Sequence, residues 1–348
     1  MFKILTMKLN KTLALLVLFL TLGITNPSFA QNKIALYSGI GVWTDGIIAL
    51  SSFFQWANFD FDLVTEGDMN STRLSSYDLL IIPGGNAGKY ADYITNDGKQ
   101  AILEFVQNGG SYLGICAGSY FAAQTTVWNG NILHYGLNLF DGTAIGPITD
   151  IAEWPYYEMA EIEFNNNDTI ATFLTDNKQI LYYGGPYFVR ADSAFDTVAL
   201  FANYKPDPAI IKYSYGDGRV VLMSPHPEIE ENSTRDGTDF AGYLDDRESD
   251  WDVLYYSILW LKHQSQSQIQ TSAEEPDRLA IFPNPVRNNL YIRTNTHINT
   301  IRIYNLHGQL IKATSHTSTI DVSGLLSGTY ILEITTSNSV IRQKFIKL

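Results

Sequence analysis

The sequence predicts an α/β three-layer sandwich with a mostly parallel sheet over residues 31–264, followed by a small all-β sandwich over residues 279–348. In the first segment, apolar runs typical of buried strands alternate with amphipathic runs typical of helices, which indicates parallel strands joined by helical crossovers. In the second segment, short alternating runs are separated by Asn, Gly and Ser, as in a sandwich of strands. The Gln- and Ser-rich residues 265–278 between them predict a linker.

The elements of the first domain follow from apolar periodicity and from capping and turn residues. Strands are expected at residues 33–39, 61–65, 77–85 and 111–116. Helices are expected at residues 44–58, 99–110, 117–128 and 249–263. Within residues 208–228, the sequence Gly216-Asp217-Gly218 separates two apolar runs and predicts a β-hairpin.

The N-terminal residues 1–30 have the composition of a secretory signal peptide. Three lysines precede an apolar run, and Ser28 and Ala30 provide the small residues that favour cleavage before Gln31. The alternative is a membrane anchor, but the run is short against the ~20 apolar residues that a spanning helix needs. No other stretch approaches that length, so no permanent membrane span is expected.

Charge is distributed unevenly along the chain. The total is −13, from 23 Lys and Arg against 36 Asp and Glu, which argues against nucleic acid as the main partner. Residues 31–264 hold 12 basic and 31 acidic residues, a net charge of −19, whereas residues 279–348 hold 7 basic and 2 acidic residues, a net charge of +5. This asymmetry supports separate modules.

The chain contains one cysteine, Cys116, which excludes an intrachain disulfide and a cysteine-rich zinc site. No cluster of metal ligands is apparent in the sequence, so neither a metal nor a cofactor is expected. A lone thiol is either a small buried apolar side chain or a nucleophile.

The sequence around Cys116 favours the nucleophile. Gly114-Ile115-Cys116-Ala117-Gly118 lies at the end of an expected strand and directly before an expected helix, which is the arrangement of a nucleophile elbow. The side chain would project over the carboxyl end of the strand, where α/β sheets bind ligands. The N-terminus of the following helix would favour the thiolate, the reactive form. The alternative is a structural cysteine in a glycine-rich turn.

A base for this nucleophile is expected at His226. It follows a predicted strand, and Glu228 two residues later can point the same way and orient the imidazole. Of the other two histidines in the module, His263 falls near the end of the last helix and His134 has no acidic residue two positions away. The alternative for His226 is a solvated histidine in a turn.

A third candidate element is Ile82-Pro83-Gly84-Gly85, at the end of an earlier strand. A glycine pair at this edge of the sheet leaves a backbone N–H free. Together with the N–H of Ala117, it can form an oxyanion hole, although most strand-end glycine pairs are simply turns.

In this order, PGG (83–85), GICAG (114–118) and HPE (226–228) resemble the motifs of the class I glutamine amidotransferase-like superfamily, which has a flavodoxin-like fold. The longer strings GICAGSYFAA, YYGGPYF (182–188) and SPHPE resemble the biotin–protein ligase N-terminal branch. The resemblance covers about residues 33–262.

The resemblance implies that Cys116 is the nucleophile, His226 the general base, Glu228 its partner, and Gly85 and Ala117 the oxyanion donors. It also suggests three substrate-binding candidates, Gly84, Tyr120 and Tyr187. Residues 117–121, Ala-Gly-Ser-Tyr-Phe, depart from the pattern of glutamine-using members, so the resemblance does not extend to glutamine as the substrate. No biotin-ligase catalytic module is visible in the chain.

The second domain resembles the C-terminal sorting domain of the bacterial type IX secretion system in the stretches IFPNPVRNNLYI, IRIYNLHGQLI, IDVSGLLSGTYILEI and VIRQKFIKL. The resemblance covers nearly all of residues 279–348 and implies an Ig-like sandwich recognised by the secretion translocon. The product would pass through the periplasm and be released or attached to the cell surface. Without the resemblance, an accessory β-domain that binds carbohydrate or protein remains open.

Taken together, the sequence predicts a secreted cysteine hydrolase that cleaves an amide C–N bond in an unidentified small molecule or peptide. The alternative is a non-catalytic module that binds a small molecule or peptide on the same scaffold. A third hypothesis is redox or carbonyl chemistry at Cys116, and a fourth is a structural protein of the cell surface.

Overall fold

The structure is a computed structural model that describes residues 33–262 and 280–348, with short gaps in each range. The gaps in the first range are residues 175–176, 191–194, 206, 231–235 and 245–248. Those in the second are residues 283, 285, 294–297, 306–307, 316 and 337–339. The predicted signal peptide and linker lie outside the described residues.

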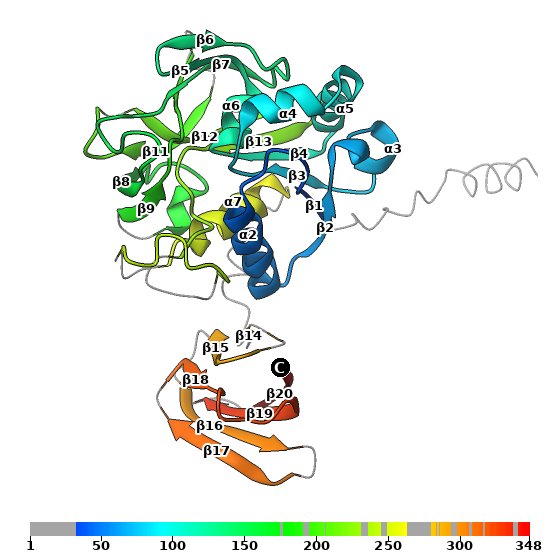
Figure 1. Cartoon of the computed structure of the whole chain (residues 1–348), viewed down its shortest axis with the longest axis vertical. Helices are drawn as coiled ribbons and strands as arrows, with labels where there is room; N and C mark the ends of the chain where they lie inside the picture. Colours follow the sequence, from blue (N-terminus) through cyan, green and yellow to red (C-terminus); the bar gives the residue numbers. More distant parts are fainter. Residues whose placement is uncertain are drawn as a thin grey trace, which may run out of the picture. The chain divides into compact units, whose positions relative to one another are not determined.

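A nine-stranded sheet forms the centre of the first domain, in the order β2-β1-β3-β4-β13-β12-β11-β8-β9 (Figure 1). Its first five strands in this order are parallel: β2 (Asp60–Val64), β1 (Lys33–Tyr37), β3 (Leu79–Ile82), β4 (Ser111–Ile115) and β13 (Gly218–Met223). The other four are antiparallel: β12 (Pro208–Tyr215), β11 (Asp196–Phe201), β8 (Glu158–Phe164) and β9 (Lys178–Tyr182). The predicted parallel sheet is therefore confirmed for five neighbouring strands, whereas each of the other four is antiparallel to the strand before it in the sheet.

Helices cover both faces of this sheet, as the predicted three-layer sandwich requires (Figure 1). One face carries α2 (Thr44–Ala57) and α7 (Trp251–Leu261), and the other carries α4 (Ala87–Tyr93), α5 (Asn96–Gln107) and α6 (Ala117–Ala122). Alternate residues of β1 separate the two cores, because successive side chains of a strand point to opposite faces. Ile34 and Leu36 pack with Phe53 of α2, whereas Ala35 and Tyr37 pack with Tyr90 of α4.

Short helices complete the first domain: η1 (Glu66–Asp68), α3 (Ser71–Leu74) and η2 (Ala171–Phe173). Within the described part of the chain, no helix is both long enough and apolar enough to cross a membrane.

The helix expected over residues 117–128 is wrong beyond Ala122. There the chain continues as β5 (Ala123–Trp128), because its last four residues, Thr-Thr-Val-Trp, are β-branched or aromatic and favour a strand. β5 belongs to a second sheet, in the order β10-β7-β5-β6. The other strands of this sheet are β6 (Asn131–Leu133), β7 (Phe140–Gly146) and β10 (Tyr187–Val189).

The second domain consists of antiparallel strands in two sheets, in the orders β14-β15-β18 and β17-β16-β19-β20. Their bounds are β14 (Ala280–Phe282), β15 (Asn289–Arg293), β16 (Ile298–Asn305), β17 (Leu310–Ser315), β18 (Thr319–Asp321), β19 (Gly328–Thr336) and β20 (Val340–Lys347). One buried cluster joins apolar side chains of the two sheets, among them Leu290, Ile320, Ile303, Leu332 and Phe345. The predicted small all-β sandwich is confirmed.

Candidate active site

Cys116 occupies the turn between β4 and α6, at the carboxyl edge of the parallel strands. Its φ of 47° and ψ of −101° place this non-glycine residue in a strained region of backbone space. The turn is fixed by the Cys116 N–H, which donates to the carbonyl oxygen of Met223 at 2.8 Å. Such strain at the end of a central strand is characteristic of residues held for function.

The two glycines that flank the turn allow α6 to lie close to the sheet. A Cβ on Gly118 would collide with the carbonyl oxygen of Ile82 in β3, and a Cβ on Gly114 would lie 2.8 Å from the backbone of Gly118. The spacing Gly-x-Cys-x-Gly is therefore required for the close approach of helix and strand, in addition to the turn itself.

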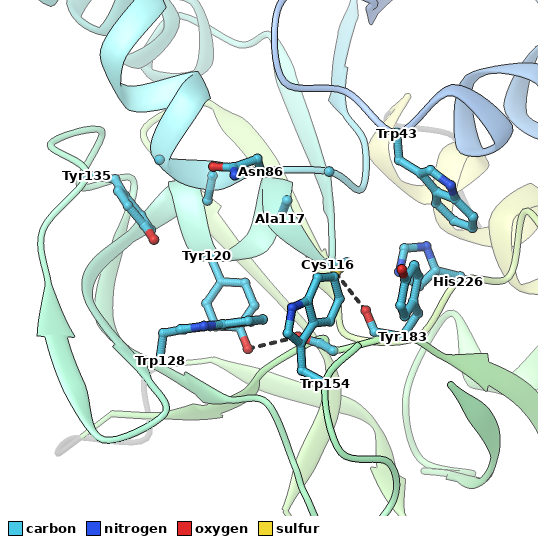
Figure 2. Close-up of a pocket in the computed structure, with 14 residues that line it drawn as sticks. Trp43, Asn86, Cys116, Ala117, Tyr120, Trp128, Tyr135, Trp154, Tyr183 and His226 are labelled. Atoms are coloured by element: carbon cyan, nitrogen blue, oxygen red, sulfur yellow. Dashed lines mark hydrogen bonds between the residues drawn. The ribbon is translucent and has the colours of Figure 1, made fainter. Parts of the chain in front are cut away.

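The thiol of Cys116 is nearly enclosed, with 7% of the residue exposed, and it belongs to a free cysteine. Its Sγ lies 3.5 Å from the carbonyl oxygen of Tyr183, within reach of a weak S–H···O hydrogen bond (Figure 2). The backbone of residue 183 thus lies beside the sulfur.

His226 and Glu228 form a buried pair directly after β13. Nδ1 of His226 donates to Oε1 of Glu228 at 2.8 Å, and the two side chains are 1% and 0% exposed. Hydrogen bonds fix the backbone of both residues. The His226 N–H donates to the carbonyl of Leu181, and the carbonyl of Glu228 accepts from the indole N–H of Trp251. Among the described residues, Nε2 of His226 has no hydrogen-bond partner.

The environment of His226 favours the protonated imidazole. Burial alone would lower its pKa, but the negative charges of Glu228 and of a Cys116 thiolate outweigh burial and raise the pKa of His226 from 6.5 to about 10. At neutral pH the residue is therefore an imidazolium that can stabilise a neighbouring thiolate and supply a proton.

The loop after β3 packs against this pair. A Cβ on Gly84 would lie 2.6 Å from Cε1 of His226, so only glycine leaves space for the imidazole in its present position. The carbonyl of Gly84 accepts hydrogen bonds from the N–H of Trp43 at 3.0 Å and from the hydroxyl of Tyr90 at 2.9 Å, which fix the loop.

The predicted oxyanion donors, Gly85 and Ala117, both line the cavity that contains Cys116. Gly85 has a φ of +149° and forms an isolated bridge with Val42, and a Cβ there would collide with the carbonyl of Gly41. Ala117 is the first residue of α6, where a backbone N–H has no partner within the helix.

These residues surround a cavity of about 420 Å³ (Figure 2). Its lining comprises Trp43, Gly85, Asn86, Ala87, Gly88, Cys116, Ala117, Tyr120, Trp128, Tyr135, Trp154, Tyr183, Gly184 and His226. Such a volume suits a small organic molecule or a short peptide segment.

The structure brings together most, but not all, of the residues singled out in the sequence. Cys116, His226, Gly85, Ala117 and Tyr120 line the cavity, and Glu228 lies behind His226. Two substrate-binding candidates do not line it: Gly84 faces the imidazole instead, and Tyr187 lies in β10 and packs against the hydrophobic core.

Five aromatic lining residues were not identified from the sequence as site residues: Trp43, Trp128, Tyr135, Trp154 and Tyr183. They come from separate segments that the tertiary fold brings together. The string YYGGPYF contains Tyr183, but the resemblance it carries suggests Tyr187 as the substrate-binding candidate.

No group of three or more His, Cys, Asp or Glu side chains with the geometry of a metal site occurs within the described ranges.

Comparison with known proteins identifies two families in the chain. Residues 36–249 match the family described as "Biotin-protein ligase, N terminal", and residues 280–348 match the family described as "Secretion system C-terminal sorting domain".

Two relatives and two solved structures illustrate the similarity. An uncharacterized protein of Chlamydia muridarum is 35% identical over 164 residues, which is 43% of this chain and 60% of that protein. A biotin–protein ligase of Schizosaccharomyces pombe is 28% identical over 169 residues, 43% of this chain and 25% of the ligase. The chain therefore matches less than two thirds of the length of either relative.

Among solved structures, a glutamine amidotransferase has a TM-score of 0.48 at 14% identity, covering 66% of this chain and 98% of that one. A second, from Thermotoga maritima, has a TM-score of 0.41 at 17% identity, covering 70% and 91%.

The match to the first family covers more than half of the chain and includes the strand, turn and helix that carry Cys116 and the segment that carries His226 and Glu228. The chain belongs to the biotin–protein ligase N-terminal family, and its residues 280–348 match the secretion system C-terminal sorting domain.

Proposed function

We propose that this protein is a secreted cysteine hydrolase that cleaves an amide C–N bond, with Cys116, His226 and Glu228 as its triad. The supporting observation is the imidazole of His226, which is held by Glu228 at 2.8 Å and lines the same cavity as the strained Cys116. A nucleophile, a base and an orienting carboxylate in this order constitute the machinery of acyl transfer.

In the first half of the reaction, the Cys116 thiolate attacks the amide carbonyl carbon, and the carbonyl oxygen acquires the negative charge. The N–H groups of Gly85 and Ala117 bind this oxyanion, each donor contributing about 3 kcal/mol of transition-state stabilisation. Nε2 of the His226 imidazolium then gives its proton to the leaving nitrogen. The C–N bond breaks, and an amine or ammonia departs from a thioester on Cys116.

In the second half, water replaces the departed amine. Neutral His226 takes a proton from the water, and the resulting hydroxide attacks the thioester carbonyl. The carbon–sulfur bond breaks, and Cys116 leaves as the thiolate that the imidazolium stabilises. Throughout, Glu228 keeps Nδ1 protonated and Nε2 directed to the reaction.

The sorting domain supports export of the chain by the type IX system. The predicted signal peptide directs the chain to the periplasm, and residues 279–348 then engage the type IX translocon. The product is released or attached to the cell surface. Because the chain has a single cysteine, no second thiol of its own can oxidise with Cys116 on the way.

The second candidate function is a non-catalytic module that binds a small molecule or peptide. The aromatic lining of the cavity favours it, because such walls provide affinity whether or not chemistry follows.

Acyl probes directed at thiols, followed by a small library of amides, separate the two functions. The hydrolase account expects a covalent acyl adduct on Cys116 and release of amine from at least one amide, both lost in Cys116→Ala. Binding without adduct or amine release would support the module and contradict the hydrolase.

A further inference from the structure

Six of the fourteen residues that line the cavity have aromatic side chains, and they come from segments that are distant in the sequence. Trp43 precedes α2, Tyr120 lies in α6, Trp128 ends β5, and the other three lie in loops, namely Tyr135, Trp154 and Tyr183 (Figure 2). Rings assembled from so many segments indicate a surface shaped for a ligand rather than the packing of one element.

Four of these rings contact one another in series. Trp154 stacks on Tyr183 with centroids 4.9 Å apart and an interplanar angle of 22°. Trp128 meets Trp154 edge to face at 5.5 Å, and Tyr120 meets Trp128 in the same way at 5.5 Å. The hydroxyl of Tyr120 donates to the carbonyl of Gly184 at 3.0 Å, which anchors the series. Such a wall is organised before a ligand arrives.

The aromatic wall begins at the nucleophile. Tyr183, whose ring stacks on Trp154, also provides the carbonyl oxygen that lies 3.5 Å from the sulfur of Cys116. On the other side, Trp43 meets the imidazole of His226 edge to face at 5.1 Å. A group attached to a carbonyl carbon beside the sulfur therefore has aromatic faces within a few bond lengths.

The described lining side chains are uncharged, apart from the imidazole of His226 and the reacting thiol. A free amino acid would have to bring a carboxylate against these rings, where its hydration is lost and the described lining side chains offer no cation other than the imidazolium of His226. A sugar can also stack on aromatic rings, but its hydroxyl groups need hydrogen-bond partners. Among the described lining residues, side-chain donors and acceptors are confined to Asn86, the indole N–H groups, the tyrosine hydroxyls and the reacting pair.

We infer that the ligand of this cavity is an amide whose acyl group ends in a flat, uncharged ring, and that free glutamine is not the substrate. The inference rests on the proposed function only in that the amide is assigned to the sulfur end of the cavity. The ring lies against Trp154 and Trp128, and the amide carbon lies beside Cys116.

Three primary amides test the inference, because they share the scissile group and differ in what is attached to it. L-Glutamine carries the charged head group, butanamide carries none, and 4-phenylbutanamide carries an aromatic ring. Binding is measured by isothermal titration calorimetry on the full chain with Cys116→Ala, which cannot turn the amides over. We expect 4-phenylbutanamide to bind at least about tenfold more tightly than butanamide, and glutamine more weakly than either.

The variant Trp154→Ala tests whether the ring of the ligand lies against Trp154. Trp154 is 42% exposed, so we expect the variant to fold and the tenfold advantage of 4-phenylbutanamide to fall to about twofold or less. Trp128→Ala provides a second test of the same wall. The matched control is Tyr93→Ala, which removes a half-exposed aromatic side chain of α4 outside the cavity and leaves all three affinities unchanged.

Equal binding of butanamide and 4-phenylbutanamide, or tighter binding of glutamine, overturns the inference. The wild-type chain, assayed for ammonia release from the same amides, distinguishes this failure from failure of the proposed function. Ring-dependent binding without ammonia release would support the inferred ligand class and refute the hydrolase. Preferential hydrolysis of glutamine, lost in Cys116→Ala, would support the hydrolase and refute the inferred ligand class.

Discussion

Nδ1 of His226 lies 2.8 Å from Oε1 of Glu228, and both side chains are almost completely buried. A carboxylate can only accept, so this contact fixes the proton on Nδ1 and gives the imidazole one orientation. Nε2 is left for the cavity, where the described residues offer it no hydrogen-bond partner and where Cys116 lies. A pair that served only to stabilise the fold would not need this asymmetry.

Glu228→Gln tests the orienting carboxylate. We expect acylation of Cys116 by a thiol-directed acyl probe to slow by at least about 100-fold, because the amide neither fixes the tautomer nor stabilises the imidazolium. The rate is followed by mass spectrometry of the intact chain.

The control is Glu230→Gln, two residues along the same segment. Glu230 is also buried, but it accepts hydrogen bonds from the hydroxyl of Ser249 at 2.9 Å and the N–H of Asp250 at 3.2 Å. This substitution should reduce the free energy of unfolding and leave the acylation rate of the folded protein unchanged. Equal slowing by both variants would assign Glu228 a structural role alone.

The raised pKa of His226 predicts how stability depends on pH. The protonated imidazole stabilises the folded state fully below the unfolded pKa of 6.5, and this contribution is lost as pH rises through the folded pKa of about 10. The free energy of unfolding should therefore fall over this interval, by up to about 1.4 kcal/mol per pH unit from this residue. Urea denaturation across the interval should show the fall in the wild-type chain and a much flatter curve in His226→Gln. Parallel curves would contradict the assignment.

Gly84→Ala tests the space that the imidazole occupies. The added Cβ would lie 2.6 Å from Cε1 of His226, so the ring must move away from its present position. We expect acylation of Cys116 to slow by about tenfold or more, since small displacements of a catalytic group are costly. Gly67→Ala is the control, because the nearest atom to its Cβ would lie 3.8 Å away, an ordinary contact. If Gly84→Ala acylates at the wild-type rate, the imidazole does not require this glycine.

Deletion of residues 279–348 tests whether the second domain serves export while the first domain carries the catalytic residues. We expect the truncated chain to remain in the periplasm while it keeps its acylation rate, because all the proposed catalytic residues lie in the first domain. Cell fractionation and immunoblotting follow the location. Continued export of the truncated chain would refute the sorting role of the second domain.

The nucleophile and the base could be predicted from the sequence, because reactive residue types there coincide with recognisable turns of the backbone. Cys116 and His226 each follow a strand, and the glycines around Cys116 mark a turn that no bulkier residue fits. Local patterns of this kind can be recognised without a structure. They do not reveal that Gly84 makes room for His226, because that contact joins residues distant in the chain.

Two features could not be predicted from the sequence. The switch from α6 to β5 within the expected helix was missed because short apolar runs satisfy both helical and strand periodicity, and the β-branched residues Thr125–Val127 favoured the strand. The aromatic wall was missed because Trp43, Trp128 and Trp154 have no shared spacing or motif. Their proximity exists only after folding.

Whether Cys116 is an activated nucleophile is measured by the rate at which iodoacetamide alkylates it in the folded chain at about pH 6.5, where an ordinary thiol is nearly all protonated. We predict rapid, selective alkylation in the wild-type chain and a rate at least about tenfold lower in His226→Ala, because the imidazolium stabilises negative charge that develops on the sulfur. A thiol that reacts only after unfolding, or equally in both proteins, would contradict the assignment of Cys116 as an activated nucleophile.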